Sequence, residues 1–293
     1  MRNRNRTTTQ LIRQCWDLLR ENTEWMKIPL FSSVGVLIVT IIFGILAIPI
    51  YAMTSGNNQN SSSVQTVAGA ILLFLFYFVT YGIVIYSETA LVSVVLMKLR
   101  GQQNPKAADG YAVANKHMGA ILGFAALSAT VGVIARAITE SGRNSKNFVI
   151  LILASLLASV LQGAWTLMTM MVTPVIATEN LGTIPAISRS WALFKQTWGE
   201  QVMGRLGLGF LGCLLTLGAM VPGLLILGLG FAISSPVTSI VGFGVLVIGI
   251  AVVSLLTNAA ISVFKAVLYH YATEGNTGGL LDEAQVKAAF QPA

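Results

Sequence analysis

Charge is what this sequence lacks most. Only 10% of its 293 residues are charged, whereas 55% are hydrophobic, and soluble domains carry roughly 25% charged residues. No Asp, Glu, Lys or Arg occurs in the segments 28–87, 147–178 and 206–264. Each of these segments is long enough for one or two membrane-crossing helices of about 20 residues. The composition therefore excludes a protein whose bulk lies in water.

Cysteine, histidine and catalytic motifs are also scarce. The two cysteines, Cys15 and Cys213, lie at the predicted cytoplasmic edge and within an apolar run, where no disulfide framework is expected. The two histidines, His117 and His270, have no second ligand at metal-binding spacing. Nucleotide-binding glycine motifs and strong basic patches are absent from the sequence. We therefore expect no enzyme activity, no metal or other cofactor, and no nucleic-acid partner.

Long apolar runs are what the sequence does contain. Runs of this length exclude barrel strands, which alternate over about 10 residues, and they predict transmembrane helices. Pro29 fits a break or the first turn of the first helix, and Pro174 and Pro222-Gly223 are expected to kink or interrupt the fourth and fifth. The predicted fold is an all-α integral membrane protein with six transmembrane helices, at about residues 28–53, 67–96, 118–138, 148–178, 203–232 and 238–270.

Lys and Arg are distributed unevenly between the two sides of the predicted membrane domain. Fifteen of the 18 fall on the side that holds both chain ends, and the other three (Arg136, Arg143 and Lys146) lie around one opposite loop. The first run is too long for a signal sequence, so it predicts an uncleaved span. By the positive-inside rule both termini face the cytoplasm. The predicted organisation is a cytoplasmic amphipathic segment at 1–27, a six-helix transmembrane domain at 28–275 and a cytoplasmic tail at 276–293.

A unit of one short amphipathic stretch and two spans recurs three times. The copies, at 13–101, 111–182 and 189–275, all begin and end on the cytoplasmic side, so they predict three parallel helical hairpins. The amphipathic stretches predict interfacial helices in the headgroup plane, either as sensors of lipid composition or, as we favour, as anchors for the next span. The residues expected to face lipid there are Arg13, Trp16, Arg20, Trp25, Lys27, Trp191, Lys195 and Trp198.

Ionisable residues inside the spans are functional candidates by default. Glu88 and Lys265 occupy comparable places near the cytoplasmic ends of the second and sixth spans. An ion pair between them would neutralise both charges. Alternatively, Lys265 snorkels to the interface and Glu88 lines a shallow cytoplasmic cavity.

Three more polar residues complete the set of candidates. Gln162 and Asn258 lie deeper in the fourth and sixth spans, and each is expected to form an interhelical hydrogen bond. Glu179 follows the fourth span. It either pairs with Arg189 or Arg205, or terminates its helix at the interface.

Small residues at helical spacing predict close packing of the spans. We expect this packing to lie within one chain and not at a dimer face. The positions are Ser155, Ser159 and Gly163 in the fourth span, Gly119 and Gly123 in the third, and Gly204, Gly207, Gly209, Gly212 and Gly218 in the fifth.

Five stretches resemble a known family. They are Cys15–Arg20, Lys98–Gly101, Thr173–Glu179, Ser190–Glu200 and Leu268–Ala272, and the family that they resemble is an uncharacterised group of bacterial membrane proteins, domain of unknown function 6159. The chain is more distantly similar to the membrane part of glycerophosphodiester phosphodiesterases. The resemblance implies a multi-pass protein of the cytoplasmic (inner) membrane with no established activity. We expect no phosphodiesterase domain after Gly275.

Two functions are compatible with these features. The first, which we favour, is a non-enzymatic scaffold or subunit that binds membrane lipids, a partner membrane protein or a second copy of itself. The second is a transporter or channel for a small or lipid-like solute. It would use the kinked fourth and fifth spans and a cavity lined by Gln162, Asn258 and Glu88.

Overall fold

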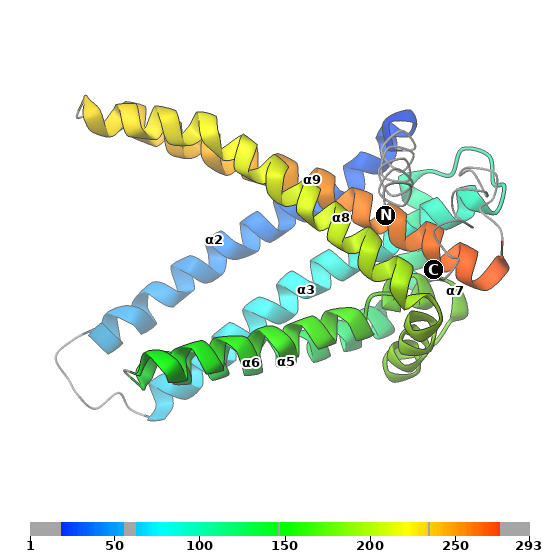
Figure 1. The fold of residues 1–293 in the computed structure, drawn as a ribbon, viewed down its shortest axis with the longest axis horizontal. Coiled ribbons are helices and arrows are strands. Elements are labelled where there is room, and N and C mark those ends of the chain that lie inside the picture. The colour runs from blue at the N-terminus through cyan, green and yellow to red at the C-terminus, as the bar shows by residue number, and fades with distance from the viewer. Residues whose placement is uncertain (1–18, 56–62, 146, 234, 276–293) are drawn as a thin grey trace. The chain divides into compact units, whose positions relative to one another are not determined.

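The computed structural model describes residues 19–55, 63–145, 147–233 and 235–275, with side chains outside 50–66 and 196–211. All regular structure in these residues is helical (Figure 1), which confirms the predicted all-α fold. Arg13 and Trp16 lie outside the described residues. Trp198 lies in a helix, but its side chain is not among those described.

Six helical segments are long and apolar enough to cross a membrane, so the predicted six spans are confirmed. The fourth span consists of two helices in sequence, α6 and α7. The short α4 provides the amphipathic stretch predicted before the third span. In chain order the elements are the 3₁₀ turn η1 (Thr23–Met26), α2 (Lys27–Ser55), α3 (Ser63–Leu99), α4 (Ala107–Lys116), α5 (Met118–Asn144), α6 (Phe148–Met168), α7 (Val172–Glu179), α8 (Thr183–Ala232) and α9 (Pro236–Glu274).

Prolines affect the spans in different ways. Pro29 lies in the first turn of α2, and Pro174 lies in the first turn of α7, just after the fourth span breaks. Both predictions are confirmed. Pro222, by contrast, lies inside α8, which continues without interruption. The helix is therefore not interrupted there, because a membrane helix tolerates the loss of one backbone hydrogen bond at proline. The alternative expectation, a kink, stays a prediction.

The described residues fold into two compact units whose boundaries pass through α2, α3, α4 and α8. Of the described residues, unit 1 contains those up to Ser33, Val94–Ala107, and those from Gln196 onward. Unit 2 consists of Val34–Ser93 and Ala108–Lys195. These units do not coincide with the three predicted repeats, which stay a prediction.

The first two spans form an antiparallel hairpin in unit 2. A Cβ atom added to Gly35 on α2 would lie 3.3 Å from Ile83 on α3. Further along α2, the ring centroids of Phe43 and Phe76 are 5.7 Å apart. Because the residue number rises on α2 while it falls on α3, the two helices run in opposite directions.

The third and fourth spans form a second hairpin in unit 2, in which α5 and α6 run side by side (Figure 1). Near the connecting turn, a Cβ atom on Gly142 would lie 2.5 Å from that of Ala154. At the other end, the ring centroids of Phe124 and Trp165 are 6.2 Å apart. Glycine at 142 therefore permits the close approach of the two helices near their turn.

The last two spans form a third hairpin, within unit 1, in which α8 and α9 run side by side (Figure 1). A Cβ atom added to Gly223 on α8 would lie 2.5 to 2.6 Å from Leu246 Cβ, Cα and N on α9. Each step along α8 is matched by a step back along α9 that is equal to within one residue, so one antiparallel register extends over the hairpin. The facing pairs are Gly212 with Thr257, Ala219 with Gly249, Gly223 with Leu246, Leu227 with Gly242, and Gly230 with Ser239.

Sequence spacing identified only part of this packing. Gly212 takes part in it as predicted, whereas Gly218 has no atom within 4 Å of an added Cβ and faces outward. Gly204, Gly207 and Gly209 lie outside the described side chains. The amphipathic stretch expected as a separate element before the fifth span is also continuous with that span, because α8 is a single helix of 50 residues.

Apolar side chains cover the outer faces of the hairpins. Phe31 on α2, Leu153 on α6, Phe231 on α8 and Val237 on α9 are each more than half exposed. Exposed apolar surface of this extent marks contact with a membrane or another protein. The folded chain therefore presents the surface that a hydrocarbon solvent requires.

Candidate functional site

Trp25 lies in a buried part of unit 1. Its side chain is only 1% exposed, and its indole Nε1 donates a hydrogen bond to the carbonyl oxygen of Pro105 at 2.9 Å. Leu19 and Ile28 are buried as well. The prediction that Trp25 faces lipid is therefore wrong, because the loop after α3 offers the indole a buried acceptor.

The basic residues near Trp25 do lie at the surface. Arg20 and Lys27 are exposed, and the Lys27 ammonium group lies 3.4 Å from a carboxylate oxygen of Glu24. Both groups of this pair are more than half exposed, so the pair adds little stability.

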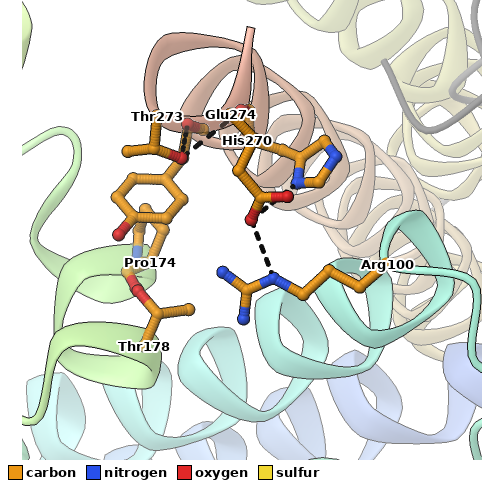
Figure 2. A network of polar contacts seen from close by, with 7 residues as sticks. Arg100, Pro174, Thr178, His270, Thr273 and Glu274 are labelled. Atoms are coloured by element: carbon orange, nitrogen blue, oxygen red, sulfur yellow. Dashed lines mark hydrogen bonds and ion pairs between the residues drawn. The ribbon is translucent and has the colours of Figure 1, made fainter. Parts of the chain in front are cut away.

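A polar network in unit 1 joins the end of α3 to the end of α9 (Figure 2). Arg100 Nε donates to Glu274 Oε1 at 2.9 Å. Nδ1 of the buried His270 lies 3.4 Å from the same oxygen, an ion-pair distance without hydrogen-bond geometry. Thr273 Oγ1 donates to the Tyr269 carbonyl at 2.9 Å, within α9. This network connects the residue after α3 to the end of α9, two segments that are far apart in the sequence. Sequence spacing did not predict it.

In unit 2, one hydroxyl group forms hydrogen bonds with the backbone on both sides of the break in the fourth span. Ser190 on α8 is fully buried. Its Oγ accepts a hydrogen bond from the backbone N–H of Met171 at 3.0 Å and donates to the Met168 carbonyl at 2.9 Å. These backbone groups flank the break between α6 and α7. Ser190 therefore satisfies the polar groups that the interrupted helix leaves open.

Glu88 lies beside the same break. Thr173, in the first turn of α7, is buried and donates a hydrogen bond from Oγ1 to Glu88 Oε1 at 3.2 Å. Glu88 itself is half-buried on α3. Lys265 is half-buried on α9, and its pairing with Glu88 stays a prediction.

Glu179 and Arg189 form the ion pair that the sequence suggested. Arg189 Nε lies 3.1 Å from each carboxylate oxygen of Glu179. Glu179 is also the last residue of α7, and the chain turns at Asn180 with φ of 49°. Glu179 therefore both pairs with Arg189 and ends its helix, the two roles that the sequence offered as alternatives.

Aromatic and basic side chains meet on the first part of α8. The rings of Trp191 and Phe194 are stacked with centroids 5.4 Å apart, and the Lys195 ammonium group lies 5.3 Å from the centroid of the Trp191 ring. Phe194 is buried, whereas Trp191 is 39% exposed and Lys195 is also exposed. Trp191 and Lys195 therefore present an indole and a cation to the surroundings of the protein.

The connection between α4 and α5 contains a perturbed histidine. Burial lowers the pKa of His117, and the charge of Lys116 lowers it further. The neutral form is therefore favoured near pH 7. Tyr86 Oη donates to Asn115 Oδ1 at 2.9 Å on the same side of unit 2.

The two deeper amides do not form the interhelical hydrogen bonds predicted for them. Gln162 and Asn258 are both exposed, and neither side chain bonds to any other side chain that the structure describes. The prediction is wrong because each residue lies on the face of its helix turned away from the neighbouring helix of its hairpin.

The small residues on α6 also face outward. Ser155 is half-buried, Ser159 and Gly163 are exposed, and an added Cβ on Gly163 would meet nothing within 4 Å. Ala158 is the α6 residue that is buried. The expectation that this stripe packs inside the chain is therefore wrong, since the helix turns its alanine face, not its serine face, inward.

The described side chains offer no group of three or more His, Cys, Asp or Glu residues placed to hold a metal ion.

Comparison with known families gives one result. A family model, described as a family of unknown function (DUF6159), matches residues 67–279 and so covers most of the chain. No curated protein matches the sequence. The predicted likeness to glycerophosphodiester phosphodiesterases stays a prediction.

Proposed function

The chain belongs to this family of unknown function, and because membership assigns no activity, we propose from the geometry that the protein is a non-enzymatic membrane scaffold or subunit. It binds membrane lipid and a partner transmembrane helix, either from another protein or from a second copy of itself. The outward position of Gln162 on α6 is the observation that supports this proposal.

Gln162 lies at a depth where water does not reach. It follows Phe148, the first residue of the span, by 14 positions, and a helix rises about 1.5 Å per residue. An amide group facing hydrocarbon costs several kcal/mol without a hydrogen-bonding partner. A second helix would supply that partner.

The residues around Gln162 suit such a contact. Ser159 and Gly163 are small and exposed, so a partner backbone can approach α6 closely. The Ser159 hydroxyl is already used within its helix, where it donates to the Ser155 carbonyl at 2.8 Å. Gln162 is therefore the group on this face that needs an external partner.

Photo-crosslinking in native membranes tests this proposal. A photoreactive residue at Ser159 is expected to give a protein adduct, whereas the same residue at the adjacent Ala158, which is 6% exposed, is expected to give none. Substituting Gln162→Leu should reduce the Ser159 adduct several-fold. Lipid adducts alone at Ser159, unchanged by Gln162→Leu, would contradict the proposed helix partner.

We propose the inner membrane of a bacterium as the location, with both termini in the cytoplasm. The excess of Lys and Arg on one side of the spans supports this orientation. The absence of catalytic motifs from the sequence supports a role without enzyme activity.

A transporter or channel is the second candidate, and the broken fourth span favours it. Discontinuous helices often form substrate sites in transporters, and here Thr173 beside the break bonds to Glu88. Gln162 and Asn258, which face outward, no longer suit a central pathway.

Thiol labelling separates the two candidates. In a chain with Cys15 and Cys213 replaced by serine, Thr173→Cys should stay unmodified by a charged, membrane-impermeant thiol reagent, because Thr173 is 3% exposed. Cysteine at the exposed Lys195 is the positive control and should react fully. Rapid labelling of Thr173→Cys would show a water-accessible pathway and favour transport.

A further inference from the structure

We propose that Trp191 and Lys195 form a binding site for the phosphate group of an anionic phospholipid. The inference rests on the proposed membrane role of the protein and names the class of lipid that it binds. It does not depend on a helix partner at α6, which involves a different face and a different experiment.

Two contacts within unit 2 place this site beside the last part of the fourth span. Arg189 pairs with Glu179, the last residue of that span. Ser190 bonds to Met168 and Met171 at the break in the same span. Trp191 directly follows Ser190, and from the Arg189 contact we infer that it lies near the level where the fourth span ends and headgroups begin.

The charge of Lys195 has no counterion in the described part of the protein. None of the carboxylates described there pairs with it, and its ammonium group contacts the face of Trp191 instead. By contrast, Arg189 pairs with Glu179 and Lys27 pairs with Glu24. A lipid phosphate is the anion available at this level, and the chain as a whole carries a net charge of +7.

The aromatic residues give the site a defined geometry. Phe194 is buried and stacks on Trp191 with an angle of 12° between the ring planes, so the indole is supported from inside. The Lys195 ammonium group also lies against the indole, 5.3 Å from the centroid of its ring. Indole rings prefer the headgroup region, and a cation held near such a ring is positioned for a phosphate oxygen.

Native mass spectrometry of the full chain tests the proposal. The protein would be purified in mild detergent and exposed to equal amounts of phosphatidylglycerol and phosphatidylcholine. We expect retention of phosphatidylglycerol to exceed that of phosphatidylcholine, and Lys195→Gln to reduce it about fivefold, the effect of one basic residue near an anionic surface. Lys195→Arg should preserve retention, and Trp191→Ala should reduce it.

Arg143→Gln is the matched control, because Arg143 is an exposed basic residue that already pairs with Glu140. It is expected to leave phosphatidylglycerol retention unchanged. Equal losses in Arg143→Gln and Lys195→Gln would overturn the proposal, since they would indicate a general charge effect. Displacement of the lipid by soluble glycerol phosphate at millimolar concentration would also overturn it, since the site would then bind a free phosphate. Circular dichroism of each variant verifies that the comparison is between folded proteins.

Discussion

Substitution of Ser190 by alanine is expected to lower the free energy of unfolding by about 2 to 6 kcal/mol. The alanine would leave the Met171 N–H and the Met168 carbonyl without their buried partner, and each unsatisfied buried group costs about 1 to 3 kcal/mol. The loss is large because the break in the fourth span has few alternatives for these groups. Circular dichroism during titration with sodium dodecyl sulfate in mixed micelles would measure it.

Ser159→Ala is the matched control for Ser190→Ala. Ser159 is exposed and donates only to the Ser155 carbonyl of its own helix, so its removal should change stability by less than about 0.5 kcal/mol. Equal unfolding curves for the two variants would show that Ser190 does not support the break. The same result would remove the argument that Arg189 and Ser190 fix the level of Trp191.

Substitution of Gly223 by alanine is expected to destabilise the hairpin of α8 and α9 by about 1 to 3 kcal/mol, the usual cost of overpacking. The added Cβ would lie 2.5 to 2.6 Å from Leu246 Cβ, Cα and N. Two of these atoms belong to the backbone, so a change of rotamer cannot relieve the overlap. The helices would have to separate, which weakens the close contacts at neighbouring glycines. The same mixed-micelle titration would measure the loss.

Gly218→Ala is the matched control on the same helix, because an added Cβ there meets nothing within 4 Å. It should be neutral or slightly stabilising, since alanine favours a helix over glycine by roughly 1 kcal/mol. If Gly218→Ala and Gly223→Ala were equally destabilised, the glycine register of the hairpin would be wrong. A disulfide between cysteines at Ala219 and Gly249 would support the register independently, because the Cβ atoms would be 3.5 Å apart.

The spans were predictable from sequence because length and hydropathy suffice to identify a helix in lipid. The ion pair of Glu179 with Arg189 was one of two pairings that the sequence allowed, the other being with Arg205, since Arg189 follows the end of the fourth span closely. Trp25 was mispredicted, because a tryptophan near a span fits the headgroup region and a buried site equally well in sequence. Its partner, the Pro105 carbonyl, is 80 residues away.

The sequence did not predict which face of each helix packs against its neighbour. Ser155, Ser159 and Gly163 form a pattern typical of an internal contact, yet Ser155 is only half-buried and the other two are exposed, as is Gln162. In water, polarity would reveal which face is inside. In lipid, both faces of a helix are apolar, so the sequence carries little information about which one packs against the neighbouring helix.

The sequence by itself determined that this protein is a six-span helical membrane protein, since a scarcity of charge over such lengths is compatible only with a hydrocarbon solvent. Only the tertiary structure decided which polar groups meet. It placed Ser190 at the broken span, brought Arg100 and His270 close to Glu274, and turned Gln162 outward. The physical reason is that hydropathy is a sum over a local segment, whereas a hydrogen bond requires two groups whose meeting depends on the packing of distant segments.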